Sequence, residues 1–145
     1  MEYLTFLGLL CRLHGKLARK LSPIFSEKGL SGTEAVTLWK IDRKGPWKTT
    51  DLAEHLGIPT STFTGILDRL EARGFIQRKA DPDDRRSIFV YGTPLLKEFM
   101  ICFTQKTEEE LRKILADLPE NNLHLILEAL VTLDRYLSSK EGKQS

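Results

Sequence analysis

The segment Thr49–Tyr91 constrains the fold more than any other part of the chain. It reads TTDLAEHLGIPTSTFTGILDRLEARGFIQRKADPDDRRSIFVY, in which two helical patterns precede two short strand patterns. Thr49 is placed to cap a first helix over residues 50–56, which Gly57 ends because glycine tolerates positive φ. A turn then leads into a second helix over residues 60–73. A helix, a tight turn and a second helix are the parts of a helix-turn-helix unit.

A charged hairpin is predicted directly after the second helix. Beyond Gly74 the apolar period changes from that of a helix to that of a strand, so Phe75–Lys79 is expected to pair with Ser87–Tyr91. The connection Ala80–Arg86 carries the letters DPDDRR. This order predicts a helix of the size that a DNA major groove admits, with a charged finger beside it.

Helices are also predicted on the N-terminal side of this segment. Apolar residues at spacings of three and four run through residues 4–25, with Ser22-Pro23 expected to bend or interrupt the helix. Ser31 and Glu34 form a capping box for a helix that Gly45-Pro46 terminates.

Two more helices are predicted after the hairpin. Thr93-Pro94 supplies an N-cap and a first-turn proline for a long helix, and Leu118-Pro119-Glu120 separates it from a last helix that reaches Leu137. The side chains expected to be buried on the long helix are Leu95, Leu96, Phe99, Met100, Phe103, Leu111, Ile114, Leu115 and Leu118.

The predicted fold is mainly α-helical with a small β-hairpin wing. A winged helix-turn-helix domain is expected over residues 31–94, with N- and C-terminal dimerisation helices over residues 1–30 and 95–140. The end segments carry more apolar surface than a three-helix winged domain can cover, and a homodimer about a two-fold axis would bury the surplus. The alternative is that these helices wrap their own domain. Residues 141–145 are expected to form a disordered tail.

Composition gives weaker constraints. The 145 residues include 41% apolar and 29% charged side chains with a formal charge of +2, as in an ordinary globular protein. Residues 43–90 hold nine Lys/Arg against seven Asp/Glu, whereas residues 95–137 hold five against eight. This distribution favours phosphate contacts by the middle of the chain, with mixed solvated faces as the alternative.

Other classes of protein find little support. Basic residues follow the first apolar run without a small-residue cleavage site, so a cytoplasmic protein with no signal peptide or membrane span is expected. The three histidines and two cysteines lack metal-ligand spacing, and neither a metal nor a cofactor is predicted. Cys11 lies on the apolar stripe and is expected to be a buried, inert thiol. No nucleophile–base arrangement suggests an enzyme.

Small polar side chains are expected on one face of the second helix. Ser61, Thr62 and Thr64 are candidates for hydrogen bonds to base edges or phosphates, and Arg69 for a phosphate or a guanine. Simple helix capping is the alternative for Ser61 and Thr62, and the two roles are compatible. The Thr49-Thr50 pair is placed for contacts with the DNA backbone.

The hairpin tip indicates DNA binding more specifically than the polar face of the second helix does. Arg85 or Arg86 is expected to insert into a narrow minor groove, where the negative potential is enhanced. Free acidic neighbours would weaken such binding, so Asp84 is expected to brace an arginine or the loop backbone. A solvated polar turn is the alternative, which explains the proline and aspartates but not the paired arginines.

Residues 52–93, LAEHLGIPTSTFTGILDRLEARGFIQRKADPDDRRSIFVYGT, resemble the MarR family of bacterial transcription regulators. Asp84-Arg85-Arg86 fits the D-x-R wing motif of that family, and LDRLEARGFIQR over residues 67–78 fits its helix-to-strand signature. The resemblance covers nearly the whole chain. It implies an obligate, triangular dimer with winged domains at two corners. It also implies repression of transcription at near-palindromic sites in double-stranded DNA.

The resemblance also implies site residues and an effector. Asp84 and Arg86 match the wing pair, whereas recognition-helix positions are matched by Ser61, Thr62, Thr64 and Arg69. The full predicted DNA-binding set is Thr49, Thr50, Ser61, Thr62, Thr64, Gly65, Arg69, Arg78, Asp84, Arg85 and Arg86. Many family members release DNA when a small aromatic or lipophilic ligand binds between the dimer helices and the winged domain. His14 and Trp39 are candidates for lining such a pocket, although an aromatic residue on an apolar stripe more often belongs to a core.

Two positions depart from the family pattern. Gly65 stands where members often have an arginine, so direct guanine reading is lost and readout of DNA shape is expected to weigh more. Gly92 replaces a leucine before Thr93, which predicts a looser joint between the second wing strand and the following helix.

Two other functions remain open at this point. One is a winged-helix module that binds a protein and no DNA. The other is a thiol-based redox-sensing regulator that uses Cys11. The paired wing arginines and the slender Ser/Thr helix face favour a DNA-binding regulator over the protein-binding module.

Overall fold

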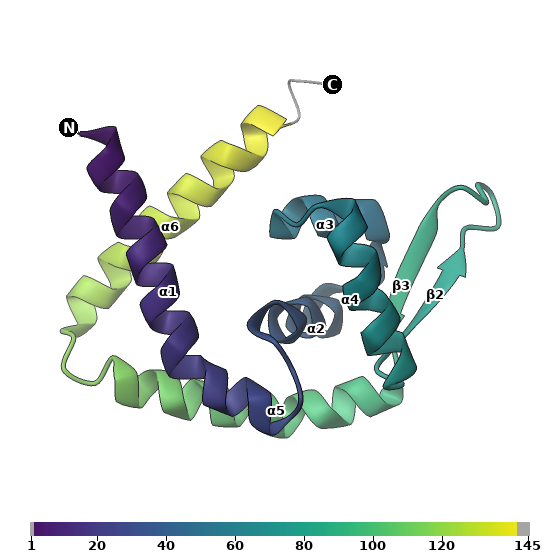
Figure 1. Cartoon of the computed structure of the whole chain (residues 1–145), viewed down its shortest axis with the longest axis horizontal. Coiled ribbons are helices and arrows are strands. Elements are labelled where there is room, and N and C mark those ends of the chain that lie inside the picture. The colour runs from purple at the N-terminus through teal and green to yellow at the C-terminus, as the bar shows by residue number, and fades with distance from the viewer. Residues whose placement is uncertain (1, 142–145) are drawn as a thin grey trace. The chain divides into compact units, whose positions relative to one another are not determined.

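The computed structural model describes residues 2–141 of the chain. The chain divides into two compact units, residues 1–107 and residues 108–145, with the boundary inside helix α5. In chain order the elements are α1 (Tyr3–Glu27), α2 (Gly32–Lys44), β1 (Trp47–Lys48), α3 (Thr49–Leu56), α4 (Thr60–Ala72), β2 (Ile76–Ala80), β3 (Ile88–Gly92), α5 (Pro94–Ile114) and α6 (Glu120–Glu141) (Figure 1). The predicted fold class is confirmed. Of the predicted tail, residues 142–145 lie outside the described residues.

Local signals in the sequence set most helix ends. The Ser31 hydroxyl accepts a hydrogen bond from the Glu34 amide at 3.1 Å, as the capping box predicts. Gly57 adopts a φ of +68° and ends α3, because a left-handed conformation is easy only for glycine. The predicted cap of α3 was wrong by one residue: Lys48 is the N-cap and Thr49 is the first helical residue.

The core of the first unit is built where α2, α3, α4 and the sheet meet. Leu38, Leu52, Leu70 and Val90 are completely shielded from solvent, one from each of these elements. Burial of one such side chain stabilises the fold by about 1.5–3 kcal/mol. The winged body therefore has a continuous core within a single chain.

The sheet contains a strand that the sequence did not predict. The strand order is β1-β3-β2, and Trp47 of β1 pairs with Val90 of β3. A two-residue strand is too short to show an apolar period, so pairing with β3 is what defines it. The predicted hairpin is confirmed with both strands shifted by one residue, and its register runs from Ile76 opposite Gly92 to Ala80 opposite Ile88.

Helix α1 reaches this core only at its C-terminal end. Ile24 and Phe25 are buried, whereas Leu4 and Leu7 are 82% and 54% exposed. Cys11 is also exposed, so the expected buried thiol was wrong for the single chain. The side chains of residues 11–20 are all exposed, so this stretch of the apolar stripe is not covered by the described residues of its own unit.

Pro23 does not interrupt α1, which continues to Glu27. Proline removes one helical hydrogen bond, but the two residues that follow it are buried and hold this turn against the core. The helix then ends where the Leu30 amide donates to the Phe25 carbonyl at 2.9 Å and Gly29 takes a φ of +69°.

Helix α5 begins as predicted and buries only part of its expected face. The Leu96 amide donates to the Thr93 hydroxyl at 3.3 Å, which confirms Thr93 as the cap. Leu96, Met100 and Phe103 are buried, but Leu95 is 49% exposed, so its predicted burial was wrong. Leu95 and Leu96 are adjacent in the helix, and adjacent helix positions do not share a face, so only Leu96 lies on the buried one.

The second unit contains the end of α5 and helix α6. Leu123, Leu127 and Leu130 of α6 are 41%, 57% and 51% exposed. No residue of α6 whose side chain is described is buried. This unit therefore presents an apolar helix face that its own described residues leave uncovered.

Candidate nucleic-acid interface

Helices α3 and α4 form the predicted helix-turn-helix. The turn is closed by the Ile58 amide, which donates to the Ala53 carbonyl at 2.9 Å. Helix α4 is anchored by Phe63, Ile66, Leu67 and Leu70, which are all buried. Its other face carries the small polar residues and is left on the surface.

The hydroxyl groups at the start of α4 are exposed. Pro59 is the N-cap and makes no side-chain capping bond, so Ser61 and Thr62 lie inside the helix rather than at its cap. Within residues 2–141, neither of these two hydroxyls has an intramolecular partner. The Thr64 hydroxyl donates to the Thr60 carbonyl at 3.0 Å, as is common for threonine in a helix. The capping alternative for Ser61 and Thr62 therefore has no support in the structure.

Two arginines of the predicted DNA-binding set are already paired. Arg69 Nε lies 3.5 Å from Glu34 Oε1, although 60% of the Arg69 side chain remains exposed. Arg78, on β2, contacts two carboxylates of α4: its Nη2 donates to Asp68 Oδ1 at 2.6 Å and its Nε to Glu71 Oε2 at 3.2 Å. These contacts tie the recognition helix to α2 and to the wing.

The Arg78 pairs change the ionisation of their members. The hydrogen bond from Arg78 lowers the pKa of Glu71 below its ordinary value. In turn, the carboxylates of Glu71 and Asp68 raise the pKa of Arg78. Both shifts favour the charged forms, so the pairs persist at neutral pH.

The wing, which comprises β2, β3 and the connection over residues 81–87, is braced from within. Asp84 Oδ1 accepts from the Arg86 amide at 3.1 Å, and Asp84 Oδ2 accepts from the Ser87 hydroxyl at 3.1 Å. The Asp81 amide donates to the Ser87 carbonyl at 2.8 Å, and Asp81 Oδ1 accepts from the Asp83 amide at 3.0 Å. The expected brace by Asp84 is confirmed, and it holds the loop backbone rather than an arginine.

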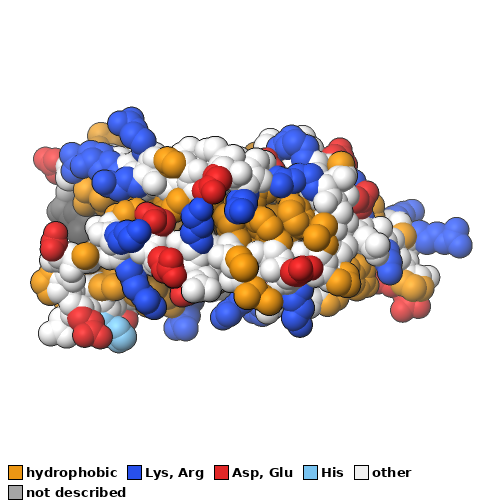
Figure 2. Space-filling model, turned by 90° about the horizontal axis from the view of Figure 1, so that it is seen from below, with side chains coloured by type: hydrophobic (Ala, Val, Ile, Leu, Met, Phe, Trp, Pro, Cys, Tyr) orange, Lys and Arg blue, Asp and Glu red, His pale blue; other side chains and the backbone are white. Residues whose placement is uncertain are grey.

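Arg85 and Arg86 remain available at the wing tip. Both side chains are exposed, and neither has an ion-pair partner in the described part of the chain. Basic side chains project from the end of the molecule formed by the wing, at the right of Figure 2. The structure therefore separates arginines that hold the winged body together from arginines that are free to meet an anion.

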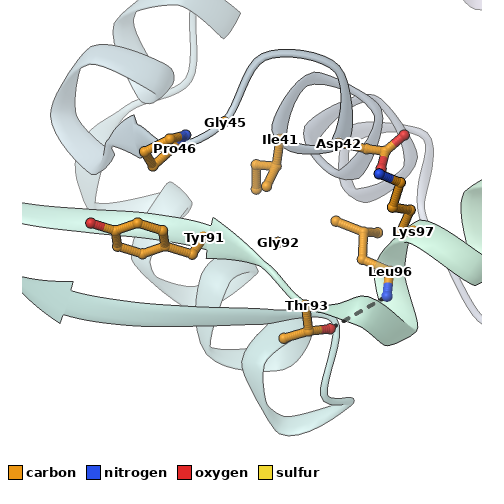
Figure 3. A pocket seen from close by; sticks show the side chains of 9 residues that line it. All are labelled: Ile41, Asp42, Gly45, Pro46, Tyr91, Gly92, Thr93, Leu96 and Lys97. Carbon is orange, nitrogen blue, oxygen red and sulfur yellow. Dashed lines mark hydrogen bonds between the residues drawn. The ribbon is translucent and has the colours of Figure 1, made fainter.

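The joint between β3 and α5 is tightly packed, contrary to the expectation from Gly92. A Cβ atom at Gly92 would lie 3.0 Å from Leu96 Cδ2 and 3.5 Å from Ile41 Cγ2. Glycine here admits these two neighbours rather than loosening the joint. Beside it lies a small open cavity of about 230 Å³, into which Ile41 and Leu96 point from opposite sides (Figure 3).

The two effector-pocket candidates are both on the surface. His14 is exposed on α1, and Trp39 on α2 is 40% exposed. Cations flank Trp39: Lys40 Nζ lies 5.0 Å and Arg43 Cζ 5.9 Å from the centre of its ring. Sequence reasoning missed these two cations. The spacing of four residues placed Arg43 on the same helix face as Trp39, whereas no such spacing indicated the adjacent Lys40.

Within residues 2–141, no group of three or more His, Cys, Asp or Glu side chains is placed to hold a metal ion. In the same range, no helix is both long and apolar enough to cross a membrane.

Known proteins share this arrangement. The model of the MarR family matches residues 30–88. Over 110 residues, 76% of this chain and 69% of the relative, the chain is 32% identical to YfiV, an HTH-type transcriptional regulator of Bacillus subtilis (strain 168). The chain belongs to the MarR family. It is therefore a transcriptional regulator of the helix-turn-helix type and not an enzyme, as the sequence predicted.

Solved structures of other proteins agree with the fold. A probable transcriptional regulator from Pseudomonas aeruginosa is 26% identical, with a TM-score of 0.76 over 86% of this chain and 93% of that one. BpsR of Bordetella bronchiseptica is 24% identical, with a TM-score of 0.73 over 87% of this chain and 90% of BpsR. The BpsR structure concerns the regulation of its DNA binding by 6-hydroxynicotinic acid.

Proposed function

We propose that this MarR-family chain is a dimeric repressor that binds a near-palindromic operator in double-stranded DNA. The observation that carries the proposal is the wing, in which Asp84 fixes the loop while Arg85 and Arg86 are left without ion-pair partners among the described residues. A rigid loop loses little conformational entropy when its arginines enter a narrow minor groove. Binding by this finger is therefore pre-organised.

Helix α4 supports the same proposal as the recognition helix. Its exposed Ser61 and Thr62 hydroxyls and the half-buried Gly65 leave a slender surface for close approach to base edges. Thr49 and Thr50 lie at the start of α3, where helix amides favour a phosphate. Arg69 keeps enough exposure to reach DNA while Glu34 orients it.

Arg78 takes a different part in this proposal. Its guanidinium is engaged by Asp68 and Glu71, so a phosphate would have to displace two carboxylates. We assign Arg78 to holding the wing against the recognition helix. The contact with DNA that the sequence suggested for it is replaced by this supporting role.

The exposed helix faces support a homodimer. Leu4 and Leu7 of α1 and Leu127 and Leu130 of α6 are each more than half exposed in the single chain. Apolar faces of this kind mark protein–protein interfaces. Two winged bodies held by such an interface match the two half-sites of palindromic DNA.

A small anionic aromatic effector fits the surroundings of Trp39. An indole ring flanked by Lys40 and Arg43 offers a stacking surface and two positive charges. BpsR, a structural neighbour, has its DNA binding regulated by an aromatic acid. We propose that an effector of this chemistry binds beside Trp39, with α1 and His14 of the dimer closing the site.

The function is tested on DNA selected from genomic fragments by the purified protein. Arg86→Ala should weaken binding to every recovered fragment and reduce the salt slope by about 0.9 for each lost phosphate contact. Arg112→Ala, outside the winged body, is the matched control. It should leave the affinity for the fragments and the salt slope unchanged. A protein that selects no DNA but captures another protein would favour the protein-binding module instead.

Base reading by α4 needs a separate measurement. Thr62→Val keeps the size of the side chain and removes its hydroxyl, so it should change the preferred base at one position of each half-site. Competition among single-base operator variants measures this preference. An equal loss on all variants would assign Thr62 to the phosphate backbone.

A further inference from the structure

Arg73, at the C-terminal end of the recognition helix, caps a different helix. Its Nη1 donates to the Gly29 carbonyl at 3.0 Å and its Nη2 to the Lys28 carbonyl at 2.7 Å. These carbonyls follow directly after α1, where the helix presents unpaired oxygens and the negative end of its dipole. One guanidinium thus binds the end of α1 to the end of α4.

An aromatic chain joins the same two helix ends from the inside. The Arg73 guanidinium lies 5.1 Å from the ring of Phe75, whose ring is 4.9 Å from that of Phe99. The Phe99 ring stacks on Phe103 at 5.1 Å, and the Phe103 ring lies 5.9 Å from that of Phe25. Both helix ends therefore lie over α5, as Figure 1 shows.

The contacts form a closed ring. Phe25 belongs to the last turns of α1, and its carbonyl accepts from the amides of Lys28 and Leu30. From there the path returns through Gly29 to Arg73. A closed ring restrains orientation better than a single contact, because rotation of α4 against α1 breaks hydrogen bonds on one side and ring contacts on the other.

We propose that Arg73 is a positioning residue that sets the angle of the recognition helix relative to α1. The proposal rests on the proposed function, because α1 carries part of the apolar face assigned to the dimer. In such a dimer, the orientation of α4 against α1 determines the distance between the two recognition helices. Arg73 thereby selects the spacing of the two half-sites without touching DNA.

The test compares Arg73→Lys with wild type on the selected operator and on versions with the half-sites one base pair closer or farther apart. Lysine keeps the charge but cannot donate to two carbonyls in a fixed fork. The variant should bind the natural spacing about five-fold more weakly, the effect of losing one ordinary hydrogen bond, and discriminate less among spacings. The salt slope should not change. Arg112→Lys is the control.

Two results on DNA would overturn the proposal. A lower salt slope in Arg73→Gln, which removes the charge that Arg73→Lys keeps, would place Arg73 against a phosphate. An unchanged discrimination among spacings in Arg73→Lys would leave Arg73 with no positioning role. The affinity for a single half-site distinguishes a phosphate contact from a positioning role, because only a phosphate contact contributes to that affinity.

A second measurement does not depend on DNA. Spin labels at Ser61→Cys and Lys20→Cys, with Cys11 and Cys102 replaced by serine, report the α4–α1 distance in the free protein. Arg73→Lys should broaden the distance distribution relative to the wild-type background. A narrow, unchanged distribution would refute the positioning role, whereas failure of the wild type to bind any DNA would refute only the proposed function.

Discussion

The winged body and the helices that flank it differ in how they use apolar residues. In the winged body, Phe63, Leu70 and Val90 are at most 1% exposed. On α6, Leu127 and Leu130 are both more than half exposed. Leucines three positions apart on a helix thus belong to a core in α4, at Leu67 and Leu70, and to an uncovered face in α6, at Leu127 and Leu130. A single chain completes the first region, and we propose that the second is completed by another copy.

The largest difference in stability between the two regions is expected when a residue of the winged core is changed. Phe63→Ala removes a buried ring from α4 and should lower the free energy of unfolding by about 3–5 kcal/mol. The loss should not depend on protein concentration, because the winged core lies within one chain. Urea unfolding at several concentrations measures it. Leu130→Ala is the comparison, and an equal, concentration-independent loss there would show that α6 is covered by its own chain.

The next effect concerns the proposed dimer. Leu127→Glu places a charge on the exposed apolar face of α6 and should weaken dimerisation by about 2 kcal/mol or more, as for a buried interface residue. Sedimentation at decreasing concentrations measures the dissociation. The circular dichroism of the dissociated chain should keep its helical signal. A wild-type chain that remains a folded monomer at all concentrations would contradict the proposed interface.

The contrast also explains what the sequence could and could not predict. In the winged body, the helix ends followed from local chemistry, as at Ser31 and Gly57, so the ends of α2, α3 and α4 were predicted within a residue. The C-terminal ends of α5 and α6 lie about four residues from the predicted ones. The brace by Asp84 was also local, since it contacts residues two and three positions away. Strand β1 was missed because it exists only through pairing with β3, more than forty residues later in the chain.

The roles of the arginines were the least predictable part of the site. Arg69, Arg73 and Arg78 look alike in the sequence, but their partners lie on α2, after α1 and on α4. Only the tertiary structure determines which of these arginines have a partner within the protein. The packing at Gly92 was misjudged for the same reason, because the neighbour that makes the joint tight includes Ile41 from a distant helix.

A smaller effect is expected at the joint between the two regions. The Thr93 hydroxyl accepts from the Leu96 amide and also lies 2.7 Å from the Gly74 carbonyl, so it links α5 to the end of α4. Thr93→Ala should cost about 1 kcal/mol, the usual cost of losing a helix cap. Thr93→Ser keeps the hydroxyl and should therefore retain most of the stability that Thr93→Ala loses. Thermal unfolding measures both, and equal losses in the two variants would assign the effect to the methyl group.

The smallest expected effect is the dependence of the winged body on acid. Arg78 lowers the pKa of Glu71 below the ordinary 4.5, so ionised Glu71 stabilises the fold. That contribution is fully present above the pKa of the unfolded chain and is lost as the pH falls through the lower pKa of the folded protein. Because 41% of the Glu71 side chain is exposed, solvent screening should keep the effect below about 1 kcal/mol.

Glu71→Gln isolates this contribution, because glutamine keeps the shape of the side chain and does not titrate. The free energy of unfolding of wild type should fall more steeply than that of the variant as the pH drops below about 4.5. Glu54→Gln is a control, since Glu54 has no ion-pair partner within the described residues. Equal acid sensitivity of wild type and Glu71→Gln would show that the Arg78 contact does not hold the wing in solution. The supporting role assigned to Arg78 would then depend on its contact with Asp68 alone.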